Sequence, residues 1–98
     1  MTTNPAHKFD QGKTRTALVP AGIIDAIGQI RTYGTNKYGD PDGWKQVETW
    51  RYEDALMRHL VEWLKDRNSV DSESGYPHIW HMACNIAFLI ERSDTDKK

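Results

Sequence analysis

The chain contains 98 residues, carries a formal net charge of −1 and holds a single cysteine, Cys84. This length predicts one small domain, the charge argues against nucleic acid as a partner, and one cysteine excludes a disulfide framework or a thiolate zinc site. No apolar stretch reaches the roughly 18 residues of a membrane span and the N-terminus lacks a signal-peptide core, so we expect a cytoplasmic protein with no membrane partner.

Residues 1–17 predict an irregular polar arm. Pro5 and Gly12 disfavour regular structure, and cationic side chains gather around one acidic residue. These charged residues are Lys8, Asp10, Lys13 and Arg15. The basic arm is a candidate phosphate-binding segment, and solvated surface charge is the alternative.

The first helix is expected over about residues 20–35, within a helical unit that we place at residues 18–92. Pro20 suits its first turn, and apolar residues recur at helical spacing. The predicted buried face consists of Ile23, Ile24, Ile27 and Ile30. One of two glycines, Gly34 or Gly39, is expected to end this helix.

A turn-rich segment, residues 33–44, follows and carries Lys37, Tyr38 and Trp44. Glycine, aspartate and proline at this density favour a surface loop, and such loops often carry function. Lys37 is a candidate phosphate ligand. The two aromatic side chains are equally well explained as base-stacking platforms and as interface residues.

The second helix is expected over residues 50–66 and has two stripes of different character. Its apolar face consists of Tyr52, Leu56, Leu60, Trp63 and Leu64. His59 and Glu62 lie on an adjacent polar stripe at helical spacing. Beside them, Asp54 and Arg58 form an i, i+4 pair.

The third helix is expected over residues 77–92 and is apolar nearly all round, as in a helix buried on most sides. Its polar exceptions, His78, His81 and Asn85, recur at i, i+3 and i+7 and share one stripe. A polar stripe on a buried helix requires hydrogen-bonding partners. Residues 93–98 are expected to fray.

The loop of residues 67–76 joins the second and third helices. If the two helices pack antiparallel, their polar stripes meet beside this loop. The grouping would contain His59, Glu62, Asp71, Glu73, His78 and His81. It is a candidate site for a divalent cation and a phosphate chain, and a buried hydrogen-bonded network without a ligand is the alternative.

Four tryptophans and four tyrosines are more large aromatic residues than a small three-helix core readily hides. We therefore expect an all-α fold, a small domain of three main helices with a polar N-terminal arm, that assembles into an oligomeric helical bundle. Trp50, Trp63 and Trp80 are expected to be partly buried between protomers.

Four motifs stand in order along the chain. They are Lys8-Phe9-Asp10-Gln11-Gly12-Lys13-Thr14-Arg15, the run 33–39 followed by Trp44, Arg51-Tyr52 with the run 55–60, and Glu73-Ser74-Gly75 with His78 and His81. Across residues 8–90 they resemble the phage-associated dATP/dGTP diphosphohydrolase N-terminal domain family. The resemblance implies kinship with MazG-like nucleoside triphosphate pyrophosphohydrolases, which are all-α bundles that form dimers or tetramers and use Mg²⁺.

The chain departs from the signature of that wider superfamily, a Glu-x-x-Glu pair on one helix and a Glu-x-x-Asp pair on the next. The comparable positions here read His59-x-x-Glu62 and His78-x-x-His81. Magnesium prefers oxygen ligands, whereas histidine suits Mn²⁺, Zn²⁺ or Fe²⁺ better. Three interpretations stay open: a different metal, no metal, or an Mg²⁺ or Mn²⁺ ion held by oxygens of Asp54, Glu62, Asp71 and Glu73.

The resulting hypothesis is a phage-type protein of the host cytoplasm that hydrolyses (d)NTP to (d)NMP and pyrophosphate with a divalent metal. No nucleophile elbow or glycine-rich phosphate loop is visible, so acyl transfer and P-loop chemistry are excluded. The candidate catalytic residues are His59, Glu62, Glu73 and His78. The candidate substrate contacts are Lys8, Asp10, Lys13, Arg15, Lys37, Tyr38, Trp44, Arg58, His81 and Asn85. The alternative is a protein that sequesters a nucleotide or nucleotide second messenger without cleaving it.

Overall fold

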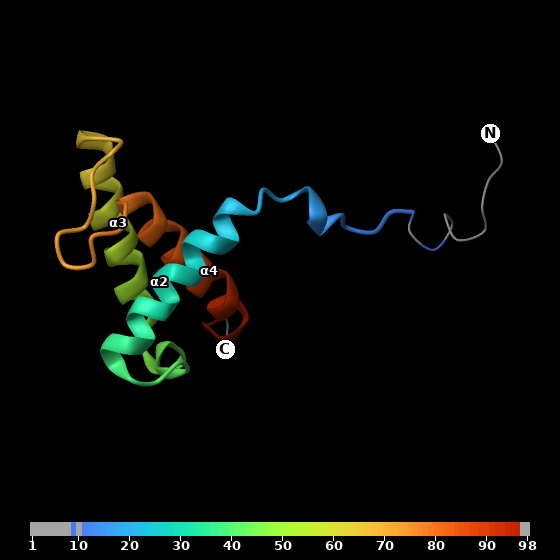
Figure 1. The fold of residues 1–98 in the computed structure, drawn as a ribbon. Coiled ribbons are helices and arrows are strands. Elements are labelled where there is room, and N and C mark those ends of the chain that lie inside the picture. Colours follow the sequence, from blue (N-terminus) through green and yellow to red (C-terminus); the bar gives the residue numbers. More distant parts are fainter. Residues whose placement is uncertain (1–8, 10, 97–98) are drawn as a thin grey trace.

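The computed structural model describes residue 9 and residues 11–96, with side chains through residue 93. Its elements are η1 (Thr16–Leu18), α2 (Gly22–Tyr38), η2 (Gly43–Gln46), α3 (Thr49–Lys65) and α4 (His78–Asp96). Figure 1 shows the three α-helices gathered in one body, with the described part of the arm leading away from it. The prediction of an all-α domain with three main helices is confirmed. Both α2 and α4 extend beyond their expected ends at residues 35 and 92.

The C-terminus of α2 shows how a single residue ends a helix. Gly39 has a φ of 82°, and its N–H donates to the carbonyl of Thr35 over 2.7 Å. Glycine reaches this left-handed conformation without the steric cost that a Cβ atom imposes. Of the two glycines expected to end the helix, Gly39 does so, and Gly34 lies inside it.

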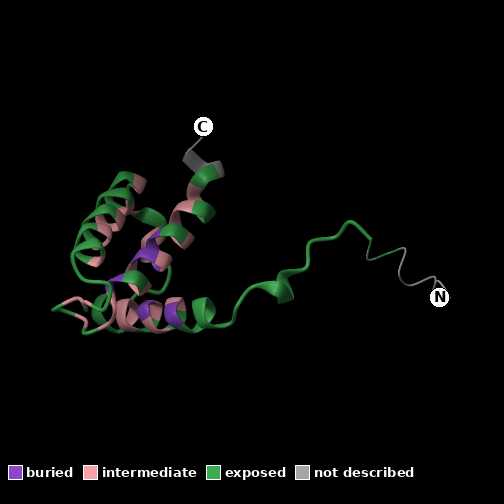
Figure 2. Cartoon of the chain, turned by 90° about the horizontal axis from the view of Figure 1, so that it is seen from above, coloured by how far each residue is buried: buried purple, intermediate pink, exposed green. Residues whose placement is uncertain are grey.

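Helix α4 packs against both α2 and α3 and is the central element of the body. The buried residues lie on α2 and α4 (Figure 2). They are Ala26, Ile30, His78, Met82, Cys84 and Asn85. The nearly all-apolar sequence of α4 therefore corresponds to its central position, and its two buried polar side chains lie on the predicted stripe.

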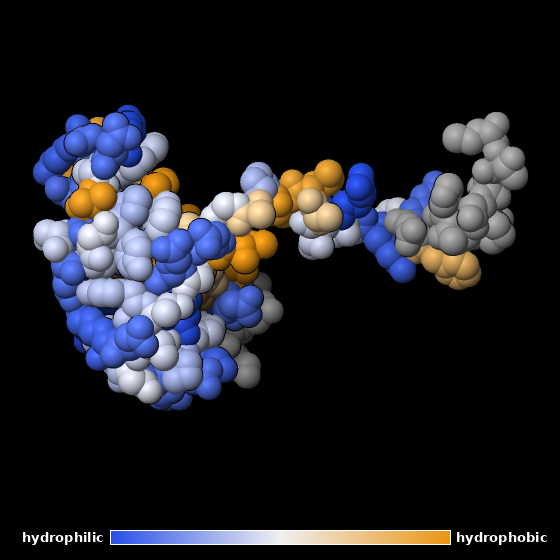
Figure 3. Space-filling model, in the orientation of Figure 1, coloured by the Kyte–Doolittle hydropathy of each residue, from blue (hydrophilic) through white to orange (hydrophobic). Residues whose placement is uncertain are grey.

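The predicted buried face of α2 is wrong at its N-terminal end. Ile30 is buried, but Ile23 is 46% exposed and Ile24 is 68% exposed. The first turn of α2 lies at the edge of the body, where the arm departs, and α4 does not cover it (Figure 2). Figure 3 shows hydrophobic side chains gathered at this point and along the arm, on a face that is otherwise largely hydrophilic.

An aromatic cluster joins η2 to the body. The Trp44 ring stacks on Phe88 of α4, with centroids 4.9 Å apart and an interplanar angle of 20°. The Trp44 carbonyl accepts hydrogen bonds from the Tyr52 hydroxyl (2.8 Å) and from Nη1 of Arg92 (3.0 Å). These contacts hold the connection between α2 and α3 against the central helix. Within the described residues, no helix is long and apolar enough to cross a membrane.

Candidate functional site

The loop between α3 and α4 is a compact turn closed by backbone hydrogen bonds. The Asp71 N–H donates to the Tyr76 carbonyl (2.8 Å), and the Gly75 N–H donates to the Asp71 carbonyl (2.7 Å). Gly75 has a φ of 77°, a left-handed conformation that favours glycine. The His78 N–H donates to the Ser69 carbonyl over 3.2 Å and ties the start of α4 to the loop. The turn therefore holds Asp71 beside the first residues of α4.

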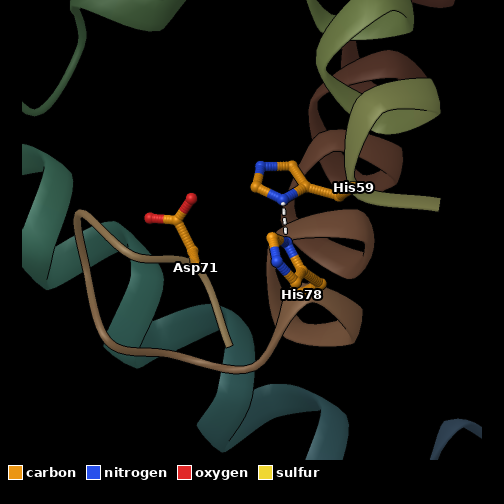
Figure 4. A group of neighbouring side chains, drawn as sticks. All are labelled: His59, Asp71 and His78. Carbon is orange, nitrogen blue, oxygen red and sulfur yellow. Dashed lines mark hydrogen bonds between the residues drawn. The ribbon is translucent and has the colours of Figure 1, made fainter. Parts of the chain in front are cut away.

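Two histidines from different helices meet at this turn (Figure 4). The Nδ1 atoms of His59 on α3 and His78 on α4 are 2.7 Å apart, within hydrogen-bonding distance. One ring must carry the proton on Nδ1 and the other must accept it. The ring of His81 also stacks on His59, with centroids 4.5 Å apart and an interplanar angle of 6°. The predicted meeting of the two polar stripes is thus present in the structure.

Ser74 connects the loop carboxylate to the histidines. Its N–H donates to Oδ2 of Asp71 over 2.8 Å, and its Oγ lies 2.7 Å from Nε2 of His81. The same Nε2 atom lies 4.0 Å from Oδ2 of Asp71. Ser74 was not among the predicted site residues. The sequence feature that could have pointed to Ser74 is its position before Gly75, at the turn of an acidic loop.

These surroundings set the protonation states of the site. Burial is the main cause that lowers the pKa of His59 to about 4, and the neighbouring His81 and His78 lower it further. Burial also lowers the pKa of His81. Burial alone would raise the pKa of Asp71, but hydrogen bonds from Ser74 and the nearby His81 outweigh it and lower that pKa. At neutral pH the site therefore combines neutral His59 with an ionised carboxylate, which are the forms that bind metal ions.

A cleft of about 510 Å³ opens beside the histidine pair. It is lined by Arg58, His59, Glu62, Val70, Asp71, Ser72, Glu73 and His78. The two exposed glutamates at this cleft have cationic partners, since Glu62 pairs with Lys65 at 3.0 Å and Glu73 pairs with Lys37 of α2. The Tyr33 hydroxyl also donates to Glu73, over 3.3 Å. Six of the predicted site residues line this one cleft, and Lys37 pairs with one of them, Glu73.

Three side chains of the cleft form a group that can hold a metal ion. One potential ligand atom from each of His59, Asp71 and His78 lies within 4.8 Å of the others (Figure 4). The predicted all-oxygen set contributes only Asp71 to this group. Glu62 and Glu73 line the same cleft, and Asp54 lies exposed on α3.

The remaining predicted residues lie in other surroundings. The Nδ2 atom of Asn85 donates to the carbonyl of His81 over 2.9 Å. Tyr38 is 75% exposed at the end of α2, and Trp44 packs on Phe88. Lys13 and Arg15 are exposed in the arm, which leads away from the body (Figure 1). Lys8 and Asp10 lie outside the described residues, so phosphate binding by the arm stays a prediction.

The fold and the cleft together define a small all-α domain with imidazole and carboxylate groups converging at one helix–helix junction. Over residues 3–98 the chain matches the family described as dATP/dGTP diphosphohydrolase, N-terminal, and it belongs to that family. The expected family membership is confirmed.

Among curated proteins, the chain is similar to the dATP/dGTP diphosphohydrolase of Salmonella phage PMBT28. The two are 33% identical over 82 residues, which are 84% of this chain and 28% of the phage protein. The chain thus spans little more than a quarter of the length of that relative. No solved structure matches it.

Proposed function

We propose that the cleft between α3 and α4 binds a purine deoxynucleoside triphosphate and hydrolyses it to the monophosphate and pyrophosphate. The observation that supports this proposal most strongly is the convergence of His59, Glu62, Asp71 and His78 at one cleft. The name of the phage relative, a dATP/dGTP diphosphohydrolase, supports the choice of substrate class.

The carboxylates of the cleft favour a role for a cation in the reaction. Three carboxylates and one guanidinium line it, and Lys65 and Lys37 pair with two of the carboxylates, which leaves little positive charge for a triphosphate. His59, Asp71 and His78 are the residues that would hold a divalent ion. When bound, such an ion offsets the phosphate charge and lowers the pKa of a coordinated water. Arg58 is the cationic side chain among the cleft-lining residues, and we assign it to a phosphate oxygen.

We assign Glu62 as the general base. It lies one helical turn after His59 on α3 and has one exposed partner, Lys65. Glu73, in contrast, is engaged by both Lys37 and Tyr33. A water oxygen attacks the α-phosphorus, and the bond between that atom and the bridging oxygen breaks. Pyrophosphate leaves with the electron pair of that bond, and the water proton passes to Glu62.

Product analysis tests this proposal. The chain is incubated with dATP, dGTP, dCTP or dTTP and a divalent metal, and the nucleotides are separated by ion-exchange chromatography. We expect monophosphate and pyrophosphate from the purine substrates, and a loss of about 100-fold or more in rate for Glu62→Gln. Glu53→Gln, the same change on the exposed surface of α3, should keep the wild-type rate. Diphosphate and inorganic phosphate as products would contradict the proposal.

Sequestration without hydrolysis is the second candidate function. The observation that favours it is histidine at positions 59, 78 and 81, where the resembled superfamily signature has carboxylates; His59 and His78 line the cleft, and His81 stacks on His59. A thermal-shift increase with a nucleotide, combined with an intact triphosphate after prolonged incubation with several metals, would select this function.

We also propose that a second copy of the chain covers one face of α3. Four large apolar side chains on this face are each between 45% and 55% exposed, and they recur at helical spacing: Trp50, Met57, Val61 and Leu64. Antiparallel pairing of two α3 helices would cover these side chains in both copies. Trp63 and Trp80, also expected at the interface, are already half-buried within one chain.

Light scattering after size-exclusion chromatography tests the oligomer. The wild-type chain should have at least the mass of a dimer, and Val61→Glu should have the mass of a monomer. Ile90→Glu, a similar change at an exposed position of α4, should leave the mass unchanged. A monomeric wild-type chain would exclude this interface.

A further inference from the structure

The ligand atoms in the cleft point to a particular class of metal ion. The group consists of His59, Asp71 and His78, which supply two imidazole nitrogens and one carboxylate. Mg²⁺ is usually held by oxygens, whereas imidazole nitrogen favours Zn²⁺, Fe²⁺, Co²⁺ and related ions. The donor set therefore differs from one built for Mg²⁺.

The spacing of the two nitrogens is close to what such an ion needs. Two adjacent ligands about 2.1 Å from an octahedral ion are about 3.0 Å apart, and about 3.4 Å apart around a tetrahedral one. The Nδ1 atoms of His59 and His78 are 2.7 Å apart. The two nitrogens would have to move apart by about 0.3 to 0.7 Å for a metal ion to take the place of the proton between them. Small rotations of the rings supply a shift of that size.

Two of the three ligands, His59 and Asp71, are held in place by groups outside the metal-binding group. The His59 ring rests against His81, at 4.5 Å between centroids, and His81 is held in turn by Ser74. Asp71 uses Oδ2 to accept the Ser74 N–H, and a carboxylate has a second oxygen that can face a cation. Such support of ligand orientation is typical of protein metal sites.

We propose that His59 Nδ1, His78 Nδ1 and the Asp71 carboxylate bind one transition-metal ion of the Zn²⁺, Fe²⁺ and Co²⁺ class in preference to Mg²⁺. Three protein ligands leave positions open toward the adjoining cleft, where water and a phosphate oxygen can bind. The inference deepens the proposed function, because it names the ion of the same site, but the ion binds without nucleotide.

Cobalt titration of the full chain, without a histidine tag or nucleotide, tests the site. Co²⁺ is added to chelator-treated protein, and the visible d–d absorption of the bound ion is followed. We expect saturation at one ion per chain, and a band that persists in about a hundredfold excess of Mg²⁺. No saturable Co²⁺ binding, or full displacement by that excess of Mg²⁺, would overturn the proposal without any variant.

Variants then identify the ligands. His59→Ala and Asp71→Asn should each weaken Co²⁺ binding by about tenfold or more, with Glu53→Gln as the control that keeps wild-type affinity. Circular dichroism establishes that each variant is folded. Wild-type affinity in both ligand variants would place the ion elsewhere and overturn the proposal.

Nuclear magnetic resonance of the imidazole nitrogens gives a readout that does not depend on mutation. On addition of Zn²⁺, the Nδ1 resonances of His59 and His78 should shift strongly, and Nε2 of His81, which faces Ser74, should not. A strong shift confined to His81 would contradict the assignment.

Catalysis separates this inference from the proposed function. A chain that binds Co²⁺ at these ligands and hydrolyses no nucleotide supports the metal site and refutes the hydrolase. A chain that hydrolyses dGTP but shows no saturable Co²⁺ binding supports the hydrolase and refutes the metal site.

Discussion

Acidification should destabilise the protein through His59. Its pKa is about 4 in the folded chain, against an ordinary value of 6.5. Between these values the unfolded chain binds more protons than the folded chain, so the free energy of unfolding falls as the pH falls. His81, whose pKa is also lowered, acts in the same direction. Asp71 contributes little in this window, because even the ordinary pKa of its carboxyl, 3.8, lies below it.

The size of the effect follows from the two pKa values of His59. These values correspond to a free energy of unfolding that is about 2 kcal/mol lower at about pH 5 than at neutral pH. His59 is only partly buried, and solvent screening reduces this loss to about 1 kcal/mol. For a domain of this size, the change corresponds to about 4–8 °C in Tm.

Urea denaturation at about pH 7 and about pH 5, with a chelator present, measures this loss. The comparison is with His59→Asn, which keeps a hydrogen-bonding side chain but does not titrate. We expect the variant to be less stable at neutral pH, and to lose about 1 kcal/mol less than the wild type on acidification. Equal losses in the two proteins would refute the assignment of a buried neutral imidazole at position 59.

Two further changes test the local structure that supports the site. Ser74→Ala removes the hydroxyl beside Nε2 of His81 and should lower the free energy of unfolding by about 1 kcal/mol in urea denaturation; an unchanged value would mean that the contact contributes nothing. Gly39→Ala should lower the free energy of unfolding by about 1 kcal/mol, because Gly39 has a φ of 82°. Gly34→Ala, inside α2, should raise it by about 0.5–1 kcal/mol. Changes of the same sign in the two variants would contradict the described end of α2.

Helical periodicity was sufficient to predict the centre of the site. A buried helix with polar residues at i, i+3 and i+7 must direct that stripe toward a neighbour that satisfies it, so His78 and His81 were expected to meet the stripe that holds His59. The short connection between α3 and α4 left few alternatives for the packing partner. These constraints are local in the sequence, and the structure agrees with them.

The features that the sequence did not predict depend on position along a helix and on loop conformation. Periodicity places Asp54 and Arg58 on the same side of α3, and Arg58, one turn closer to the α3–α4 loop, is the one that lines the cleft. The bond between Ser74 and Asp71 depends on backbone dihedrals of the turn, which side-chain types alone do not specify. The stacking of Trp44 on a distant residue of α4 is a non-local contact with no periodic signal.

Hydrolysis in oxygen-18 water reports which phosphorus atom the water attacks in the α3–α4 cleft. With dGTP and a divalent transition metal, we expect one labelled oxygen in the monophosphate, unlabelled pyrophosphate, and loss of both products in Glu62→Gln but not in Glu53→Gln. Label in the pyrophosphate would contradict attack at the α-phosphorus, and an intact triphosphate under every metal condition would contradict hydrolysis by this cleft.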